Sequence, residues 1–66
     1  MTDEEFTRAL EHLTDEQANA LSTYFDAERA YIAHIGDIDE DAHYIGMCNV
    51  YDNCLRLGVP KALLEV

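Results

Sequence analysis

The chain has 66 residues, with 14 Asp or Glu against four Lys or Arg, and its formal net charge is −10 at pH 7. A chain of this length forms one domain, residues 1–66, and buries only about 60% of its unfolded surface on folding. So much negative charge repels phosphate backbones and anionic lipid, which argues against direct binding of nucleic acid or of a membrane surface. Because 48% of the residues are hydrophobic, the charge belongs to a folded domain and not to a disordered tail.

The first predicted element is a short helix over about residues 3–13. Thr2 and Glu5 have the spacing of a capping box, in which the hydroxyl accepts from an N–H of the first turn and the Glu reaches back to the cap. Four apolar side chains then fall on one narrow stripe: Phe6, Ala9, Leu10 and Leu13. A stripe of this width predicts a helix on the flank of the domain.

A long helix is predicted over about residues 15–35. Thr14 and Gln17 repeat the capping-box spacing at its start, and Gly36 suits its end because glycine tolerates the left-handed conformation found there. Its apolar stripe is wider than that of the first helix and consists of Leu21, Tyr24, Phe25, Tyr31, Ile32 and Ile35. The pattern predicts an amphipathic helix with one buried face.

A second long helix is predicted over about residues 38–57. Asp37 and Glu40 have the spacing of a third capping box, with a carboxylate in the cap position. Apolar residues cover more than half of the circumference of this helix. We therefore expect it to be packed on more than one side, either at the centre of the domain or against a second subunit.

The fold class is determined by these elements. No segment alternates apolar and polar residues for long enough to form a strand, so the chain is predicted to be all-α. The two long helices are joined through Gly36 and Asp37, a connection so short that the helices should be antiparallel. After a second stop at Gly58, Pro60 opens a short helical turn over about residues 60–65. We expect a small helical bundle in which the N-terminal helix and this last turn flank the long pair.

Glu28 interrupts the apolar stripe of the first long helix, one turn from Tyr24 and from Ile32. An unpaired carboxylate buried at that position costs several kcal/mol. The sequence therefore predicts that Glu28 is paired, with Arg56, Arg8 or a Tyr hydroxyl. The alternative is that this part of the stripe is a surface that receives a basic partner.

The residue patterns that carry metal or catalytic chemistry are incomplete. Asp37, Asp39 and Asp41 have the alternate spacing that opens a calcium loop. That loop also needs a Gly and a closing Glu, where this chain has Ala42 and Cys48. Five side chains could bind zinc but lack the short spacings of zinc sites: His12, His34, His43, Cys48 and Cys54. We expect no metal, no cofactor and no catalytic residue, and predict that the protein is not an enzyme.

The sequence also predicts a cytoplasmic protein. Three of the first five residues are acidic, where a signal peptide needs basic residues before an apolar segment. The longest stretch without a charged residue, 42–51, is far shorter than the ~20 apolar residues of a membrane-spanning helix. Cys48 and Cys54, if on one helix, have Cα atoms about 9 Å apart, beyond the reach of a disulfide, which fits a reducing compartment.

Acidic residues are concentrated in the first two thirds of the chain. Residues 1–41 hold twelve acids against two Arg, a balance of −10, whereas residues 42–66 are neutral. In size, acidity and helical content the chain resembles small phage-encoded inhibitors, including several anti-CRISPR proteins. The resemblance implies carboxylates that imitate a phosphate backbone and occupy a basic groove on their target, in the cytoplasm of the host cell.

The expected function is therefore non-enzymatic inhibition of a basic nucleic-acid-binding protein or complex. The expected partner-binding residues are Glu4, Glu11, Asp26, Glu28, Asp37, Asp39, Glu40 and Asp41. We also expect a two-fold homodimer through an apolar surface formed by Tyr44, Met47, Tyr51 and Leu55. Two alternatives remain: an acidic adaptor or dimerisation module that recognises its partner through the apolar face of the 38–57 helix, and a halophilic housekeeping domain.

Overall fold

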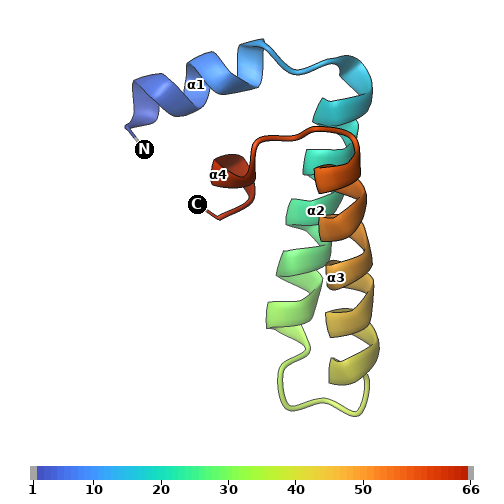
Figure 1. The fold of residues 1–66 in the computed structure, drawn as a ribbon. Coiled ribbons are helices and arrows are strands. Elements are labelled where there is room, and N and C mark those ends of the chain that lie inside the picture. The colour runs from blue at the N-terminus through green and yellow to red at the C-terminus, as the bar shows by residue number, and fades with distance from the viewer. Residues whose placement is uncertain (1, 66) are drawn as a thin grey trace.

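The computed structural model describes residues 2–65 and confirms the all-α class, with no strand in that range. Its helices are α1 (Asp3–Glu11), α2 (Asp15–Ala33), α3 (Glu40–Arg56) and α4 (Lys61–Leu64). As Figure 1 shows, α2 and α3 run antiparallel as a long hairpin, as predicted. At the upper end of the hairpin α1 leaves it crosswise, and α4 folds back beneath α1.

The starts of α1 and α2 lie at the predicted caps. The Thr14 hydroxyl accepts from the Gln17 N–H at 3.1 Å, and the Gln17 side chain accepts from the Thr14 N–H at 2.9 Å, which completes the capping box. At Thr2 the hydroxyl accepts from the Glu5 N–H at 3.2 Å. Both helices therefore begin where neighbouring residues satisfy the N–H groups of the first turn.

The connection between the long helices differs from the prediction. The cap expected at Asp37 is wrong: its carboxylate lies 3.0 Å from Nδ1 of His34, and α3 begins only at Glu40, after Asp39, which makes no side-chain cap bond. Gly36 has the expected positive φ, +90°, but within a six-residue turn over 34–39 instead of a two-residue link. The interaction between His34 and Asp37 competes with capping and lengthens the turn.

The end of α3 is a Schellman motif centred on Gly58. Gly58 has φ +87°, its N–H donates to the Leu55 carbonyl at 3.1 Å, and the Val59 N–H donates to the Cys54 carbonyl at 3.0 Å. The apolar contact that accompanies this motif is present, since Val59 and Cys54 are both buried. The motif turns the chain back so that α4 packs on the hairpin.

The core lies at this upper end of the hairpin. Its buried residues are Ala20, Leu21 and Tyr24 of α2, Cys54 of α3, and Val59, Leu63 and Leu64 of the last segment. Two aromatic pairs join α2 to α3: Tyr24 with Tyr51, with ring centroids 5.7 Å apart, and Tyr31 with Tyr44, 5.5 Å apart.

The expectation that the second long helix is packed on more than one side is wrong within the single chain. Cys54 is the one buried residue of α3, while Tyr44, Ile45 and Leu55 keep 50%, 60% and 41% of their surface exposed. The reason is that the extensive helix packing is between α2 and α3, and α4 is only four residues long.

The molecule is elongated, with extents of 39 × 23 × 15 Å and a radius of gyration of 12.7 Å. A compact domain of this length has a radius of gyration of about 11 Å. The accessible surface of 4679 Å² likewise exceeds the roughly 4250 Å² of a compact monomer of this mass. Part of the apolar surface of the hairpin is therefore left uncovered.

Candidate partner-binding surface

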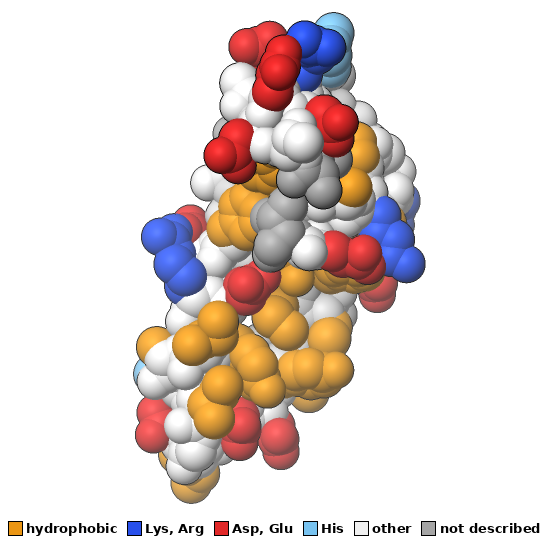
Figure 2. All heavy atoms as spheres, turned by 90° about the vertical axis from the view of Figure 1, so that its left-hand side faces the viewer, with side chains coloured by type: hydrophobic (Ala, Val, Ile, Leu, Met, Phe, Trp, Pro, Cys, Tyr) orange, Lys and Arg blue, Asp and Glu red, His pale blue; other side chains and the backbone are white. Residues whose placement is uncertain are grey.

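Exposed carboxylates gather at the two ends of the molecule. One group belongs to α1 and the first turn of α2, and the other belongs to the turn before α3 and the start of α3. Figure 2 shows acidic side chains near the top and near the bottom of one face, with hydrophobic side chains gathered over its lower half. Because α2 has 19 residues, its length separates the two groups by about 28 Å.

The eight acids expected to bind a partner are divided among these regions. Glu4 and Glu11 lie on α1, and Asp26 and Glu28 lie in the second half of α2. The other four lie in the 34–39 turn and in the first helical turn of α3: Asp37, Asp39, Glu40 and Asp41. Six of the eight are exposed, and the other two, Glu28 and Glu40, are half-buried. The structure thus divides the expected site into two ends and a middle.

The basic side chains are largely engaged inside their own helices. The ion pairs are Arg8 with Glu4 at 2.9 Å, Arg29 with Asp26, and Lys61 with Glu65 at 3.8 Å. All three pairs are solvent-exposed and so contribute little to stability. The acids of the 34–39 turn have no such neighbours along the chain, because residues 30–55 contain no Lys or Arg.

Glu28 was expected to pair with Arg56, Arg8 or a Tyr hydroxyl, and of these partners the Tyr24 hydroxyl is the one beside it. The side chain is half-buried, and no Lys or Arg among residues 2–65 lies within ion-pair distance of it. Arg8 pairs with Glu4 instead. Burial first, and then the charge of Glu28 and a side-chain hydrogen bond with it, raise the pKa of Tyr24. The carboxylate is left without a counter-charge.

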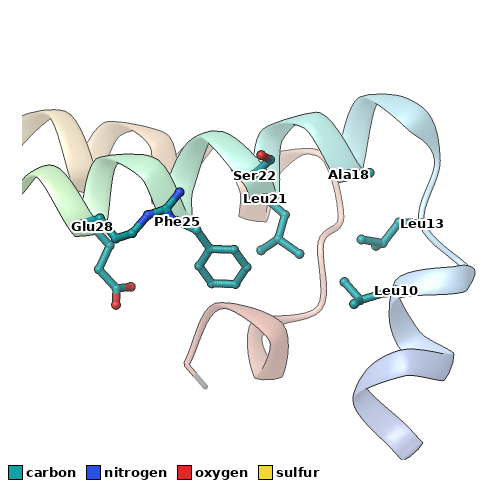
Figure 3. Close-up of a pocket in the computed structure, with 8 residues that line it drawn as sticks. Leu10, Leu13, Ala18, Leu21, Ser22, Phe25 and Glu28 are labelled. Atoms are coloured by element: carbon teal, nitrogen blue, oxygen red, sulfur yellow. The ribbon is translucent and has the colours of Figure 1, made fainter. Parts of the chain in front are cut away.

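A groove of about 600 Å³ opens between α1 and α2, beside Glu28. Leu10 and Leu13 line it from α1 and the turn after that helix, and Leu21 and Phe25 line it from α2. In Figure 3, Phe25, Leu21 and Glu28 project to the same side of α2. The site is therefore an apolar groove with two charged side chains, Glu28 and Arg29, at its end.

This groove was not predicted from the sequence. The apolar stripe of α1 predicted a flanking helix, and Phe6, Ala9 and Leu13 do pack against the core, but α1 leaves the hairpin crosswise (Figure 1) and Leu10 stays 38% exposed. The signal that could have found the groove is in α2, where Leu21, Phe25 and Glu28 are spaced by four and three residues. That spacing places a charged side chain on the same stripe as two large apolar ones.

The four residues of the expected dimer surface are divided between interior and exterior. Met47 and Tyr51 pack against the core, while Tyr44 is 50% and Leu55 is 41% exposed. Two of the four are thus accessible to a second subunit, and self-association stays a prediction.

The 34–39 turn holds another group of titratable side chains. The His34 ring stacks on His43 with centroids 4.2 Å apart and planes 12° apart, and its Nδ1 faces the Asp37 carboxylate. In the part of the chain that the structure describes, no group of three or more His, Cys, Asp or Glu side chains is arranged to hold a metal ion. The histidine pair therefore joins the end of α2 to the start of α3.

Cys48 and Cys54 are free thiols, and burial raises the pKa of Cys54.

Comparison of the chain with known protein families, with curated proteins and with solved structures gave no match. Among residues 2–65, none of the helices is both long enough and apolar enough to cross a bilayer. The chemistry of the surface is therefore the basis for a function: two acidic ends, and an apolar groove lined at one end by Arg29 and by Glu28, which is in no ion pair.

Proposed function

We propose that this chain is a non-enzymatic inhibitor that binds a basic, nucleic-acid-handling protein and covers the surface on which that protein binds phosphate backbones. The observation that supports the proposal is the distribution of charge. Exposed carboxylates occupy both ends of a 39 Å body, while three of the four Lys and Arg side chains pair with acids of their own helix or of its C-terminal end. The field outside the protein is therefore strongly negative.

A partner that binds nucleic acid supplies the complementary field. Lys and Arg clusters that hold phosphates attract any polyanion, and such attraction speeds association and fixes orientation. In α1 the first turn carries Asp3, Glu4 and Glu5, and Glu11 lies two turns beyond Glu4, about 10 Å along the same face, so α1 can present several carboxylates to one basic groove. An inhibitor of this kind needs no reacting group, which agrees with a surface built from carboxylates and apolar side chains.

The test begins by capturing a partner from a lysate of the source cells on the immobilised full chain. The captured protein is then purified, and its binding is measured over a series of salt concentrations, with and without duplex DNA. We expect affinity to fall steeply as salt rises and the DNA to compete, because both ligands use one basic surface. Binding that is insensitive to salt and to DNA contradicts the proposal.

Charge-reversal variants locate the acids that matter. Glu11→Lys with Asp26→Lys changes two exposed acids of the acidic part of the chain, and Asp52→Lys with Glu65→Lys makes the same change in net charge outside it. We expect the first pair to slow association several-fold more than the second. Equal effects would assign the binding to net charge alone.

A second candidate is an adaptor or dimerisation module that binds through α3. The observation that favours it is the exposed apolar surface of that helix, where Tyr44 and Ile45 keep 50% and 60% of their surface exposed. Light scattering at micromolar concentration tests it. If the chain is a dimer that Ile45→Ser dissociates, this candidate is supported. If the chain is a monomer, self-association is excluded as the role of this surface.

A further inference from the structure

The stripe of α2 that lines the groove continues along the helix beyond it. Leu21, Phe25, Glu28 and Ile32 are spaced by four, three and four residues, so they form one stripe about 16 Å long on α2. Burial falls along this stripe. Leu21 is 3% exposed, Phe25 and Glu28 are half-buried, and Ile32 is 57% exposed.

The spacing indicates what kind of element covers the stripe. Alternating steps of three and four residues are the pattern by which one helix packs along another, with each side chain set between side chains of the partner. Within residues 2–65 the segments that pack on the core of the hairpin are α1 with the turn after it, and α4. α1 leaves the hairpin crosswise (Figure 1), and α4 is four residues long and too short to run beside Phe25, Glu28 and Ile32 together. About two turns of a further helix match the open length from Phe25 to Ile32.

The charge of that helix is indicated by Glu28. No Lys or Arg of residues 2–65 forms an ion pair with this carboxylate, and Arg29, which also lines the groove, is paired with Asp26. A second copy of the chain would bring another net charge of −10, so repulsion opposes it as the occupant. A helix with Lys or Arg beside its apolar stripe supplies the missing counter-charge.

We propose that the groove binds a basic amphipathic helix of the partner, with apolar side chains against Phe25 and Ile32 and a Lys or Arg side chain against Glu28. The proposal extends the proposed function, because it names the element that a basic partner presents. It is nevertheless tested separately, with a synthetic helix in place of the partner.

The probe is a capped peptide of about 15 residues made of Leu, Lys and Ala, with Leu at steps of four and three residues so that they fall on one face. Its control has the same composition, with the Leu residues spread around the helix. Both are titrated into the ¹⁵N-labelled full chain. We expect the first peptide to shift the amide signals of Leu10, Leu21, Phe25 and Ile32, and to bind about tenfold more tightly than the control.

Two variants with matched controls locate the contact. Ile32→Ser and Ile45→Ser change residues of nearly equal exposure, 57% and 60%, and only Ile32 lies on the groove stripe. Ile32→Ser is expected to weaken peptide binding about tenfold and Ile45→Ser to leave it unchanged. Glu28→Gln is expected to weaken it about fivefold, and Glu16→Gln, which removes the same charge on the opposite side of α2, less than about twofold.

Several results would overturn the proposal. Equal binding of the two peptides would mean that charge alone holds them, and equal loss in Ile32→Ser and Ile45→Ser would place the contact elsewhere. A chain that dimerises, loses the dimer in Ile32→Ser and does not bind the peptide would assign the stripe to a second copy. Failure of the peptide leaves salt-sensitive capture of a basic partner intact, so the two proposals fail independently.

Discussion

Both ends of the α2–α3 hairpin carry large apolar side chains, but these are buried at one end and exposed at the other. At the upper end, Leu21 is 3% exposed and Cys54 is fully buried. At the lower end, Ile35, Ile38 and Ile45 keep 56%, 100% and 60% of their surface exposed. The same pair of helices therefore forms a core at one end and an open surface at the other.

The difference lies in the segment after Gly58. The Schellman motif returns the chain over the upper end, where Leu63 and Leu64 become buried, and no segment of residues 2–65 does the same at the lower end. Two packed helices bury only their contact stripe, so apolar side chains beside that stripe need a third layer. The part of the α2 stripe from Phe25 to Ile32 is the part that this third layer does not cover.

The largest expected effect comes from removing a side chain of the third layer. Leu63→Ala empties a fully buried site and should cost about 2–5 kcal/mol, a large part of the stability of so small a domain. Ile38→Ala, at a residue that is 100% exposed, should cost close to nothing. Urea denaturation followed by circular dichroism measures both. Comparable losses would show that the lower end is covered in solution.

The next largest loss of stability is expected from substituting the two glycines with positive φ. Gly58→Ala and Gly36→Ala each place a side chain in the left-handed region, at a cost of about 1–2 kcal/mol. At Gly58 the new Cβ would also lie 3.3 Å from Nε2 of Gln17, whereas at Gly36 no heavy atom outside its neighbours lies within 4 Å. We expect a larger fall in melting temperature for Gly58→Ala. Equal falls would assign the cost to backbone conformation alone.

Helix ends were the most predictable part of the fold, because the groups that fix them are close in sequence. Thr2, Thr14 and Gly58 lie at helix ends, as their spacing predicted, whereas Gly36 has the expected positive φ but lies three residues beyond the last residue of α2, inside the 34–39 turn. The start of α3 was mispredicted because Asp37 had two possible local partners, the cap position and His34. Which partner it takes depends on the geometry of the turn, which sequence spacing does not specify.

The candidate site was less predictable, since it depends on contacts between distant segments. Glu28 was recognised as unusual from its position in an apolar stripe, but its burial depends on how far α4 extends over the hairpin. Leu10 was placed on the apolar stripe of a flanking helix, and its exposure depends on the direction in which α1 leaves the hairpin. Neither the reach of α4 nor the direction of α1 can be read from the hydrophobic period of a single helix.

A smaller effect is expected at Gln17, which links the start of α2 to the end of α3. Its Nε2 donates to the Leu57 carbonyl at 2.8 Å, while its Oε1 accepts from the Thr14 N–H. Gln17→Glu keeps the capping box but loses this donor and places a negative charge at the C-terminal end of α3. We expect it to cost about 1 kcal/mol, as much as Gln17→Ala. Full stability in Gln17→Glu would mean that the box alone matters.

The smallest effect is a pH dependence at alkaline pH, to which the upper end contributes through Cys54. Burial raises the pKa of the Cys54 thiol above its ordinary value of 9.0, so the folded chain holds this proton more tightly than the unfolded chain. The resulting stability is complete below pH 9 and is lost as the pH rises through the raised pKa. The raised pKa of Tyr24 acts in the same direction from pH 10.0 upward. Unfolding free energy measured in urea should therefore decline above pH 9.

The matched variants separate this decline from general alkaline denaturation. Cys54→Ala removes the titrating thiol and should make the decline between about pH 9 and pH 10 shallower, even though it lowers stability at neutral pH. Cys48→Ala, at a half-buried free thiol of the same helix, instead removes the side-chain hydrogen bond that is the first cause of the raised pKa of Tyr44. If Cys54→Ala keeps the slope of the unsubstituted chain, burial of Cys54 does not contribute to it, and the upper core is more open in solution than its packing around Leu63 indicates.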